Sequence, residues 1–449
     1  MIISGKRDSI ILLFGDIAIF LISLWVMLFV RYLEVPSLAL FETHLVPFSI
    51  LFVVWVLVFF IAGLYGRHTS VFKKRLPNII TNAEIVNIVI AALFFFLIPY
   101  FGITPKTNLF IYLLISLALI LWWRISGQDF VTTRHTERAI LIGSGEEMQE
   151  LKEEVNGNQK YGIKFESSID TNSLESFDFK DDVLNKVYSE DISVIVIDLK
   201  SEKVEPILPY LYNLLFAKVK FIDLNKIYED IFDRIPLSLL RHNWFLENVS
   251  LTPKVFYDSL KRLMDIVISL ALSLIALLLF PFVYLSIKMD DGGGILIYQD
   301  RIGKYNKPIK IIKFRTMKIA NDEGKWNNVK NEVTKVGKFL RKTRIDELPQ
   351  LWNVLLGDLS LIGPRPELPE PAERYKNEIA YYNVRHLIKP GLSGWAQIHH
   401  DKHPHHSLDV EETKNKLSYD LFYVKNRSLS LDINIALKTI KTLLSRSGL

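Results

Sequence analysis

The stretch LRKTRIDELPQLWNVLLGDLSLIGPRP, residues 340–366, places two adjacent carboxylates, Asp346 and Glu347, directly before a predicted helix. Pro349 favours the first turn of a helix, where its missing N–H costs nothing. Gly357 can end that helix in a left-handed conformation. Apolar residues between them recur at the spacing of one helical face: Leu348, Leu351, Trp352 and Leu355. The two carboxylates are therefore expected at a helix N-terminus.

Cationic side chains crowd this carboxylate pair from both sides. Arg341, Lys342 and Arg344 precede it, and Arg365 follows on a stiff Gly-Pro-Arg-Pro turn. Between residues 301 and 345 there are 14 Lys or Arg and only 3 Asp or Glu. An isolated acidic pair is usually a solvated helix cap, but a helix N-terminus with nearby cations attracts anions. The pattern therefore favours a phosphate-handling site.

Composition limits the classes of protein that fit. The 449 residues allow two or three domains, and apolar residues make up 49% of them, concentrated in separate segments. The formal net charge is only +5, so we expect no nucleic-acid partner. The chain has no cysteine, which excludes disulfides, thiolate metal sites and a cysteine nucleophile.

Four apolar runs open the sequence, and each is near the length that crosses about 30 Å of hydrocarbon as a helix. They occupy residues 10–30, 46–66, 85–102 and 109–123. Basic residues precede the first run and lie between the second and third: Lys6, Arg7, Arg67, Lys73, Lys74 and Arg75. Under the positive-inside rule these segments are cytoplasmic. Residues 1–135 are therefore predicted to form a four-helix transmembrane anchor with both ends in the cytoplasm.

Residues 136–250 alternate strand and helix patterns, which predicts a Rossmann-like α/β domain with a parallel sheet. Gly143 and Gly145 follow the first strand, as in a dinucleotide fingerprint. Met148 occupies the position of the third glycine, although Asp170 is placed to bind a ribose hydroxyl. A vestigial or regulatory domain is favoured over dinucleotide chemistry.

A fifth apolar run, residues 263–287, follows Lys261 and Arg262 and contains Pro281. If it crossed the membrane, the rest of the chain would lie on the opposite face from the α/β domain. Proline removes a helical hydrogen bond and kinks the helix, so the run can instead enter one leaflet and return. We favour this re-entrant helix because basic residues flank the run on both sides. A spanning helix is the alternative.

Residues 251–449 are the catalytic candidate, predicted as a mainly α-helical domain. Two of its helical patterns set an apolar stripe beside basic residues, which is typical of helices that lie on a membrane. The first has Lys335, Lys338, Arg341 and Lys342 opposite Val336, Phe339 and Leu340, and the second has Ile433, Leu437, Ile440 and Leu444 beside Lys438 and Lys441. Each alone is explained better as a core-facing helix, but next to a membrane anchor both favour docking on the bilayer.

Motifs from residue 261 onward resemble, in the same order, those of the bacterial sugar transferase family, the monotopic polyprenyl-phosphate phosphoglycosyl transferases. They are Lys261-Arg262 with Asp265, Gln299-x-Arg301-x-Gly303, Lys313-Phe314-Arg315-Thr316-Met317, Asp346-Glu347-Leu348-Pro349-Gln350-Leu351, Gly363-Pro364-Arg365-Pro366 and Pro390-Gly391-Leu392-Ser393-Gly394-Trp395-Ala396-Gln397. The layout of four spans, a Rossmann-like domain and this module resembles the long-chain members.

The resemblance implies transfer of a sugar-1-phosphate from a UDP-sugar to undecaprenyl phosphate, with release of UMP. This is the first step of exopolysaccharide, capsule or O-antigen assembly, on the cytoplasmic face of the bacterial inner membrane. The resemblance assigns Asp346 as the nucleophile and Glu347 as a ligand of Mg²⁺, and it alone suggests a homodimer. Cations of the motifs are the natural phosphate clamps: Arg341, Arg365, Arg315, Lys313 and Arg301.

Two places depart from the family pattern. Phe280-Pro281 stands where the family often has Ser-Pro, and residues 398–401, Ile-His-His-Asp, stand where it commonly has Asn-Gly-Arg. A phosphate- or sugar-facing arginine is then either absent or replaced by Lys402 or a histidine. Five of the ten histidines lie close together here: His399, His400, His403, His405 and His406. Such a cluster can bind Zn²⁺, but solvated loop residues are the favoured explanation.

Two other functions are open. A membrane-anchored dehydratase or reductase that acts on nucleotide sugars needs a complete glycine-rich loop and a Tyr-x-x-x-Lys pair, and residues 136–250 contain neither. A non-enzymatic nucleotide sensor or scaffold would leave the Asp346-Glu347 pair and its cations without a role.

Overall fold

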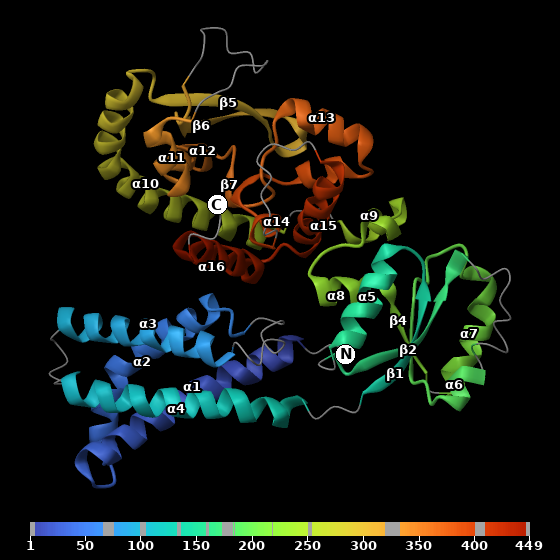
Figure 1. Cartoon of the computed structure of the whole chain (residues 1–449), viewed down its shortest axis with the longest axis horizontal. Helices are drawn as coiled ribbons and strands as arrows, with labels where there is room; N and C mark the ends of the chain where they lie inside the picture. Colours follow the sequence, from blue (N-terminus) through green and yellow to red (C-terminus); the bar gives the residue numbers. More distant parts are fainter. Residues whose placement is uncertain are drawn as a thin grey trace. The chain divides into compact units, whose positions relative to one another are not determined.

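The structure is a computed structural model that describes residues 5–65, 76–98, 105–132, 136–158, 161–172, 183, 185–217, 219–249, 254–318, 333–399 and 409–445. The chain forms two compact units, Met1–Asp230 and Ile231–Leu449 (Figure 1). The first contains the apolar helices of the N-terminal third and an α/β domain. The second contains the residues around Asp346.

Four long helices form the first part of the chain: α1 (Gly5–Tyr32), α2 (Leu38–Ile61), α3 (Leu76–Leu97) and α4 (Pro105–Thr132). They pack around fully buried aromatic side chains, among them Phe20, Trp55 and Tyr112. Many other apolar side chains of these helices are exposed, among them Phe14, Val53 and Phe110, as in helices that contact lipid. The sequence therefore encodes a membrane protein with several apolar helices.

A buried ion pair joins two of these helices. Arg124 of α4 pairs with Asp16 of α1, and both side chains are fully buried. The hydroxyl of Tyr65 donates to Asp16 at 2.7 Å, and Nη1 of Arg124 donates to the carbonyl of Leu64 at 2.8 Å. Charges inside an apolar bundle require such pairing, because an unpaired ion there is strongly destabilising.

The α/β domain contains one sheet of four parallel strands in the order β2-β1-β3-β4. The sheet confirms the prediction of a parallel α/β domain. Its elements are β1 (Glu137–Gly143), α5 (Glu146–Gly157), β2 (Ile163–Asp170), α6 (Asn185–Ser189), β3 (Val194–Ile197), α7 (Leu208–Leu214), β4 (Lys220–Asp223) and α8 (Leu224–Phe232). Strand β3 consists of β-branched residues that are all buried, and the last five residues of β1 are buried as well, as expected of the central strands of a parallel sheet.

The second unit is mainly helical, with a two-stranded antiparallel sheet and a short parallel pair of strands. Its elements are α9 (His242–Asn248), α10 (Val255–Asp291), β5 (Leu296–Ile302), β6 (Pro308–Phe314), α11 (Lys335–Lys342), η10 (Ile345–Glu347), α12 (Gln350–Leu356), β7 (Ser360–Ile362), α13 (Pro369–Glu378), η11 (Tyr382–Leu387), β8 (Gly391–Ser393), α14 (Trp395–His399), α15 (Val410–Asn426) and α16 (Leu429–Ser445).

This unit begins at Ile231, before the boundary at residue 251 that the sequence suggested. Ile235, Leu240 and Trp244 pack into one hydrophobic cluster with side chains of α13 and α15. The indole N–H of Trp395 donates to the carbonyl of Asp233 at 2.8 Å. The segment that precedes α10 is thus part of the second unit's core.

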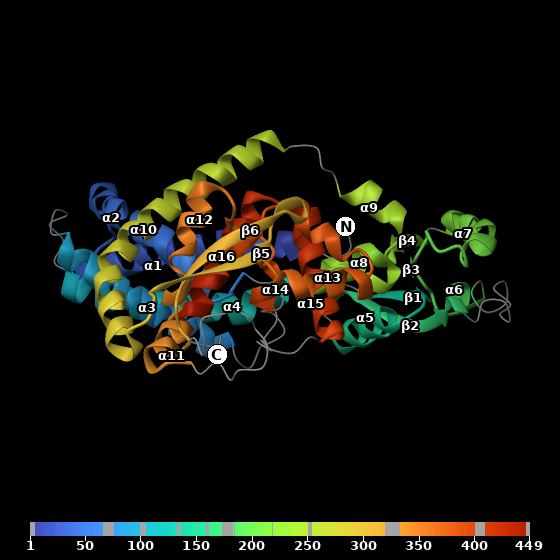
Figure 2. The ribbon, with the colours of Figure 1, turned by 90° about the horizontal axis from the view of Figure 1, so that it is seen from above.

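Helix α10 is continuous over 37 residues and contains Pro281. A straight helix of that length would extend about 55 Å. Both views of the ribbon show α10 as a bent helix (Figures 1 and 2). Proline explains a bend, because it lacks the N–H that would donate to the preceding turn.

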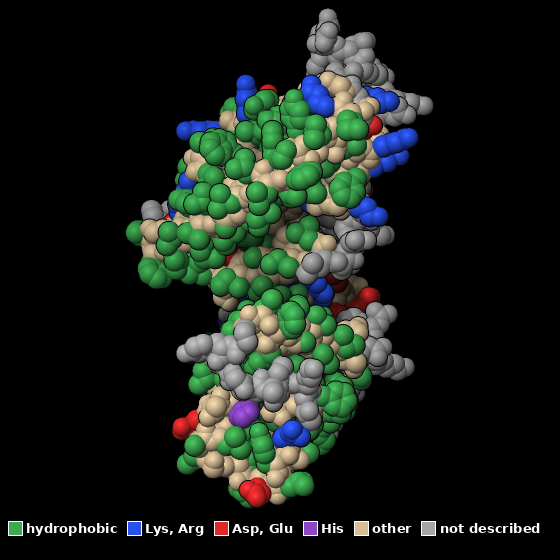
Figure 3. Space-filling model, turned by 90° about the vertical axis from the view of Figure 1, so that its left-hand side faces the viewer, with side chains coloured by type: hydrophobic (Ala, Val, Ile, Leu, Met, Phe, Trp, Pro, Cys, Tyr) green, Lys and Arg blue, Asp and Glu red, His purple; other side chains and the backbone are tan. Residues whose placement is uncertain are grey.

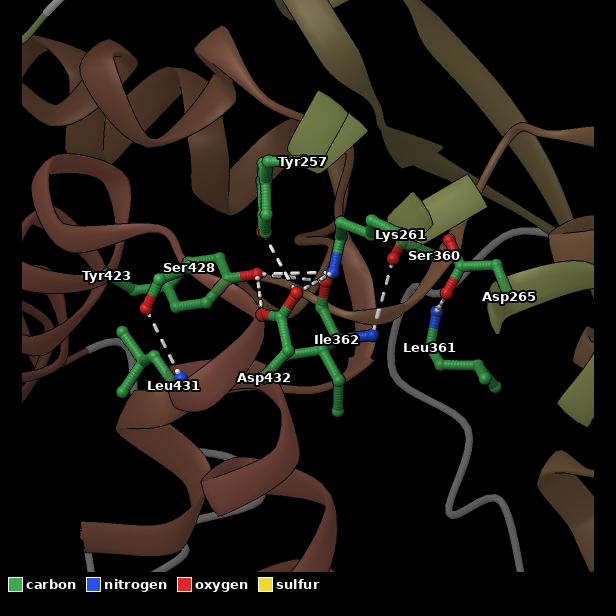
Figure 4. A network of polar contacts seen from close by, with 10 residues as sticks. All are labelled: Tyr257, Lys261, Asp265, Ser360, Leu361, Ile362, Tyr423, Ser428, Leu431 and Asp432. Carbon is green, nitrogen blue, oxygen red and sulfur yellow. Dashed lines mark hydrogen bonds and ion pairs between the residues drawn. The ribbon is translucent and has the colours of Figure 1, made fainter. Parts of the chain in front are cut away.

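The N-terminal part of α10 is fastened to the second unit by three polar side chains. Nζ of Lys261 lies 3.0 Å from Oδ2 of Asp432 (Figure 4). The hydroxyl of Tyr257 donates to the same oxygen, and the hydroxyl of Tyr423 donates to Oδ1. Oδ1 of Asp265 accepts from the N–H of Leu361 at 3.0 Å. Arg262 caps the C-terminus of α12: its guanidinium donates to the carbonyls of Val354 and Leu355 at 2.6 and 2.7 Å.

The C-terminal part of α10 contacts the same unit. Val283 and Ile287 are buried against Phe314 and Leu340. Oδ2 of Asp290 accepts from the first turn of α11, at the N–H of Val336, over 3.0 Å. Both ends of α10 therefore lie on one folded body.

Between these ends, α10 exposes an apolar surface. Only 11% of its most apolar stretch is buried, whereas the corresponding stretches of α1–α4 are 33% to 39% buried. Hydrophobic side chains cover much of the face of the second unit that Figure 3 shows. Phe339 of α11, Trp352 and Leu356 of α12, and Ile433, Ile440 and Leu443 of α16 are exposed as well. Within the described residues, α1–α4 and α10 are the helices long and apolar enough to cross a membrane.

Candidate active site

The two carboxylates lie in η10, a single 3-10 turn that leads into α12. Arg344 precedes the turn in a left-handed conformation with φ of 57°. Pro349 caps α12 at its N-terminus, and Gly357 ends the helix with φ of 96°, as the sequence predicted. The carboxylates therefore precede the α-helix by a few residues, because the 3-10 turn intervenes.

The buried face of α12 differs from the prediction. Trp352 is 58% exposed, although the apolar spacing placed it with Leu351 on one core-facing stripe. Two polar side chains, Gln350 and Asn353, are buried instead. Asn353 accepts from the N–H of Ile312 at 3.1 Å and donates to a second main-chain group of β6 at 2.7 Å. These hydrogen bonds hold α12 against β6, which explains why a polar residue is buried there.

Glu347 is the centre of a cluster of cations. Its Oε1 lies 2.8 Å from Nη2 of Arg365, 3.4 Å from Nζ of Lys313 and 3.9 Å from Nη1 of Arg344. Burial by itself would raise the pKa of Glu347, but these three cations outweigh it and lower that pKa to about 2. Glu347 is therefore ionised at neutral pH.

Asp346 has a different environment from its neighbour. Its side chain is buried, and Oδ1 has no hydrogen-bond partner among the residues whose positions are given. Burial and the adjacent charge of Glu347 raise the pKa of Asp346 to about 6, against the opposing effect of Lys313, Arg344 and Arg341. A carboxylate that is poorly solvated and has a free oxygen is a suitable nucleophile.

The structure brings some of the predicted clamps to this pair. Lys313 lies on β6 and Arg301 on β5, and both point to the same face of the hairpin. Nη1 of Arg301 donates to the carbonyl of Pro366 at 3.3 Å. Burial and the nearby charge of Arg365 lower the pKa of Arg301. These cations and Arg365 thus form one side of the site.

Two other predicted clamps have structural contacts. Nε of Arg341 donates to Oγ1 of Thr316 at 2.9 Å, while its charge still acts on Asp346. Arg315 donates to the carbonyl of Gly294, in the loop after α10. A Cβ at Gly293 would lie only 2.6 Å from this guanidinium. Arg315 therefore supports that loop, and its role toward phosphate stays a prediction.

The turn that carries Arg365 is built from closely packed backbones. The N–H of Gly363 donates to Ser393, and the N–H of Gly391 donates to Pro364, at 2.8 and 2.9 Å. A Cβ on Gly391 would lie 2.1 Å from the nitrogen of Gly363. The segments 363–366 and 390–394 are therefore packed together, and the pairing of β7 with β8 fixes the Gly-Pro-Arg-Pro turn.

Several residues that complete the site were not predicted from the sequence. Asp432 and Tyr423 bind Lys261, and Arg385 binds the main chain of Arg365. Their partners lie 20 to 171 residues away in the chain, so these contacts could not be predicted from local sequence patterns. The predicted residues Lys261, Arg262 and Asp265 serve to attach α10 to this unit.

The α/β domain has an acidic edge where a nucleotide would be expected. Asp170 ends β2, Asp198 follows β3 and Asp223 ends β4, all at the carboxyl ends of the parallel strands. At the third glycine position, Met148 packs against Gly143, with Sδ 3.5 Å from where a Cβ of that glycine would lie. Met148 thus occupies the place where a dinucleotide fingerprint needs a glycine for close helix–strand packing, which weakens the alternative of a dinucleotide-dependent enzyme.

The histidine cluster lies outside the described residues except for His399. That imidazole is stacked on Tyr419 and bonds through Nδ1 to the carbonyl of Trp395 at 3.1 Å and through Nε2 to Lys438 at 3.0 Å. Across the described part of the chain, no three His, Cys, Asp or Glu side chains are grouped so as to hold a metal.

The fold and the site define a class: a membrane protein with a carboxylate pair among anion-binding cations. Residues 256–446 match the family described as Bacterial sugar transferase. The exopolysaccharide production protein PSS of Rhizobium leguminosarum bv. phaseoli is 37% identical over 194 residues, which are 42% of this chain and 96% of that protein. The chain belongs to the bacterial sugar transferase family.

Longer relatives match over part of their length. The UDP-N-acetylgalactosamine-undecaprenyl-phosphate N-acetylgalactosaminephosphotransferase of Aeromonas hydrophila is 38% identical over 244 residues, 53% of this chain and 56% of the relative. The UDP-glucose:undecaprenyl-phosphate glucose-1-phosphate transferase of Escherichia coli K12 is 41% identical over 187 residues, 40% of this chain and 39% of the relative. The chain thus aligns with about half or less of these two relatives.

Proposed function

We propose that this protein transfers a sugar-1-phosphate from a UDP-sugar to undecaprenyl phosphate, as the first membrane-bound step in assembly of an exopolysaccharide, capsule or O-antigen. The observation that carries the proposal is the Asp346-Glu347 pair. One carboxylate is buried with a free oxygen, and the other is ionised among Arg365, Lys313 and Arg344. The names of the relatives support the two substrates.

The proposed reaction has two displacements at phosphorus. An oxygen of Asp346 attacks the phosphorus that carries the sugar, and the bond from that phosphorus to the bridging oxygen breaks, which releases UMP. A phosphate oxygen of the lipid then attacks the same phosphorus and displaces Asp346. The carboxylate is regenerated, and the sugar-bearing diphosphate stays on the lipid.

The cations of the site bind and orient the phosphates in both steps. Arg365 can bind phosphate oxygens through two parallel N–H groups, whereas Lys313 offers a point charge. Both already lie within 3.4 Å of Glu347, which holds them in place before substrate arrives. The arrangement is preorganised for the charge that develops at phosphorus.

A divalent cation fits the donor set of this site. Mg²⁺ prefers carboxylate oxygens and keeps phosphates and waters in its shell. Oδ1 of Asp346 is unpartnered within the described structure, and Glu347 is ionised. We propose that Glu347 holds Mg²⁺ together with the diphosphate of the substrate, where the ion would offset phosphate charge.

The reaction should lose rate at acid pH because protonated Asp346 cannot attack. With its pKa raised to about 6, the deprotonated fraction falls as pH drops below that value. We expect kcat/KM to rise about tenfold per pH unit on the acid side and to level off between about pH 6 and 7. Initial rates of UMP release across pH measure this limb.

An arginine variant tests the cause of that pH limb. The charge of Arg344 lowers the pKa of Asp346, so Arg344→Gln should move the limb to higher pH. Arg374 is exposed on α13, so Arg374→Gln is the matched control. This variant should not change the pH at which the rate falls. If the acid side of the pH–rate profile does not shift in Arg344→Gln, the group responsible for it is not Asp346.

We propose that α10 is a re-entrant helix, so that the catalytic part of the chain lies on the cytoplasmic face of the membrane, the same face as the α/β domain. Both ends of α10 contact one folded body. If α10 spanned the membrane, about 30 Å of hydrocarbon would separate its two ends. Its middle is apolar and exposed, and the apolar side chains of α11, α12 and α16 are available to rest on the same bilayer.

Cysteine labelling tests this topology, since the chain has no native cysteine. We expect Lys254→Cys, before α10, and Gly294→Cys, after it, to react with a membrane-impermeant maleimide only when the cytoplasmic face is accessible. Val35→Cys, in the loop between α1 and α2, should react only from the opposite face. A spanning α10 would instead make Gly294→Cys react together with Val35→Cys.

The function itself is tested with the purified membrane protein, Mg²⁺, undecaprenyl phosphate and a panel of UDP-sugars. We expect UMP release that depends on the lipid and on one or a few of the sugars. If no UDP-sugar leads to UMP release, the proposed function is wrong and a nucleotide sensor or scaffold is favoured.

A further inference from the structure

The main chain that carries Arg365 is held from both sides. The carbonyl of Pro366 accepts from Arg301, and the next carbonyl, that of Glu367, accepts from the N–H of Ile302 at 2.9 Å. On the other side, Nη2 of Arg385 donates to the carbonyl of Arg365 itself at 3.0 Å. The position of the Arg365 side chain therefore depends on a second arginine, which lies on η11.

Arg385 is a buried connector between three elements. Its side chain is 5% exposed. Nη1 donates to the hydroxyl of Tyr382 at 2.8 Å and lies 3.5 Å from Glu367, while Nη2 forms an ion pair with Asp420 of α15 at 2.8 Å. A planar guanidinium can serve these partners at once in one fixed orientation, which a lysine ammonium cannot.

The contacts form one continuous chain from α15 to the carboxylate pair. Asp420 orients Arg385, Arg385 holds the carbonyl of Arg365, and Arg365 reaches Glu347 at 2.8 Å. A shift of about 1 Å in a group that positions a substrate can cost a hundredfold in rate. The guanidinium of Arg385 binds Tyr382, Glu367, Asp420 and the carbonyl of Arg365 rather than the carboxylate pair, so it would act through Arg365.

We propose that Arg385 is a positioning residue of the transferase site: it fixes the main chain at Arg365 so that this guanidinium meets Glu347 and the phosphates of the substrate. This inference rests on the proposed function for its kinetic consequence. Its structural consequence, an ordered turn at residues 363–366, does not depend on that function.

The test compares Arg385→Lys with Arg234→Lys in the full-length protein. Arg234 is a matched control because it also binds α15, at Asn415 over 2.8 Å. We expect Arg385→Lys to lower kcat/KM for the UDP-sugar by about tenfold or more, and to speed deuterium exchange in the peptide 360–368. Arg234→Lys should do neither, even if it lowers the melting temperature equally.

A double variant separates positioning from general stability. On an Arg365→Lys background, Arg385→Lys should cost less than about a further twofold, because the group it positions has already changed. Tyr382→Phe, a milder variant that removes one partner of Arg385, should raise exchange in the same peptide if Arg385→Lys fails to fold.

Three results would overturn the inference: equal effects of Arg385→Lys and Arg234→Lys, a full tenfold loss on both backgrounds, or unchanged exchange at residues 360–368. If the wild-type protein releases no UMP, the proposed function fails, and the exchange measurement alone then decides the role of Arg385.

Discussion

Replacing Asp346 by Asn is expected to abolish UMP release, with a loss of at least about a thousandfold. The amide has nearly the shape of the carboxylate, but it cannot form the bond to phosphorus that the proposed mechanism requires. The substitution should not unfold the protein, since Oδ1 of Asp346 has no partner within the described structure to lose. Removing a buried charge beside Glu347 should even raise the melting temperature slightly.

Two controls make this result specific. Asp358→Asn changes an exposed carboxylate of the same unit and should retain wild-type rates. Incubation of the wild-type protein with the UDP-sugar alone, without lipid, should leave a phosphosugar on the chain, which intact-mass spectrometry detects and which Asp346→Asn lacks. Undiminished UMP release from Asp346→Asn would exclude the covalent route and point to direct attack by the lipid phosphate.

The sequence predicted features that depend on neighbouring residues. Gly357 ends α12 as expected, because a left-handed residue after a helix is a local requirement that glycine meets best. The parallel sheet of the α/β domain also follows from local alternation of strand and helix. The motif order from Lys261 onward was sufficient to indicate the family, which the match over residues 256–446 confirms.

Other features depend on tertiary contacts that spacing cannot reveal. Trp352 has the spacing of a core residue but is exposed, since polar Asn353 takes the face toward β6 through two main-chain hydrogen bonds. Arg315 has the charge of a phosphate clamp, but its guanidinium also donates to the loop carbonyl of Gly294. Arg385 lies 20 residues beyond the turn it holds.

Gly391→Ala should cause the second large effect, by a purely steric route. The added Cβ would lie 2.1 Å from the nitrogen of Gly363 and 2.6 Å from the carbonyl carbon of Ile362, and both atoms belong to the backbone. Neither can move aside like the end of a flexible side chain, so β7 and β8 must separate. Overpacking of this kind costs about 3 kcal/mol or more, and it displaces the turn that carries Arg365.

The expected result is a lower melting temperature together with a loss of transfer activity greater than the loss of folded protein, since the turn is displaced even in molecules that fold. Gly294→Ala is the matched control: a Cβ there meets no atom within 4 Å, so stability and rate should be unchanged. Differential scanning fluorimetry and UMP release, measured on the same preparations, give both quantities. If Gly391→Ala has wild-type stability, β7 and β8 lie further apart than their hydrogen bonds indicate. The proposal that their pairing fixes the turn carrying Arg365 would then be wrong.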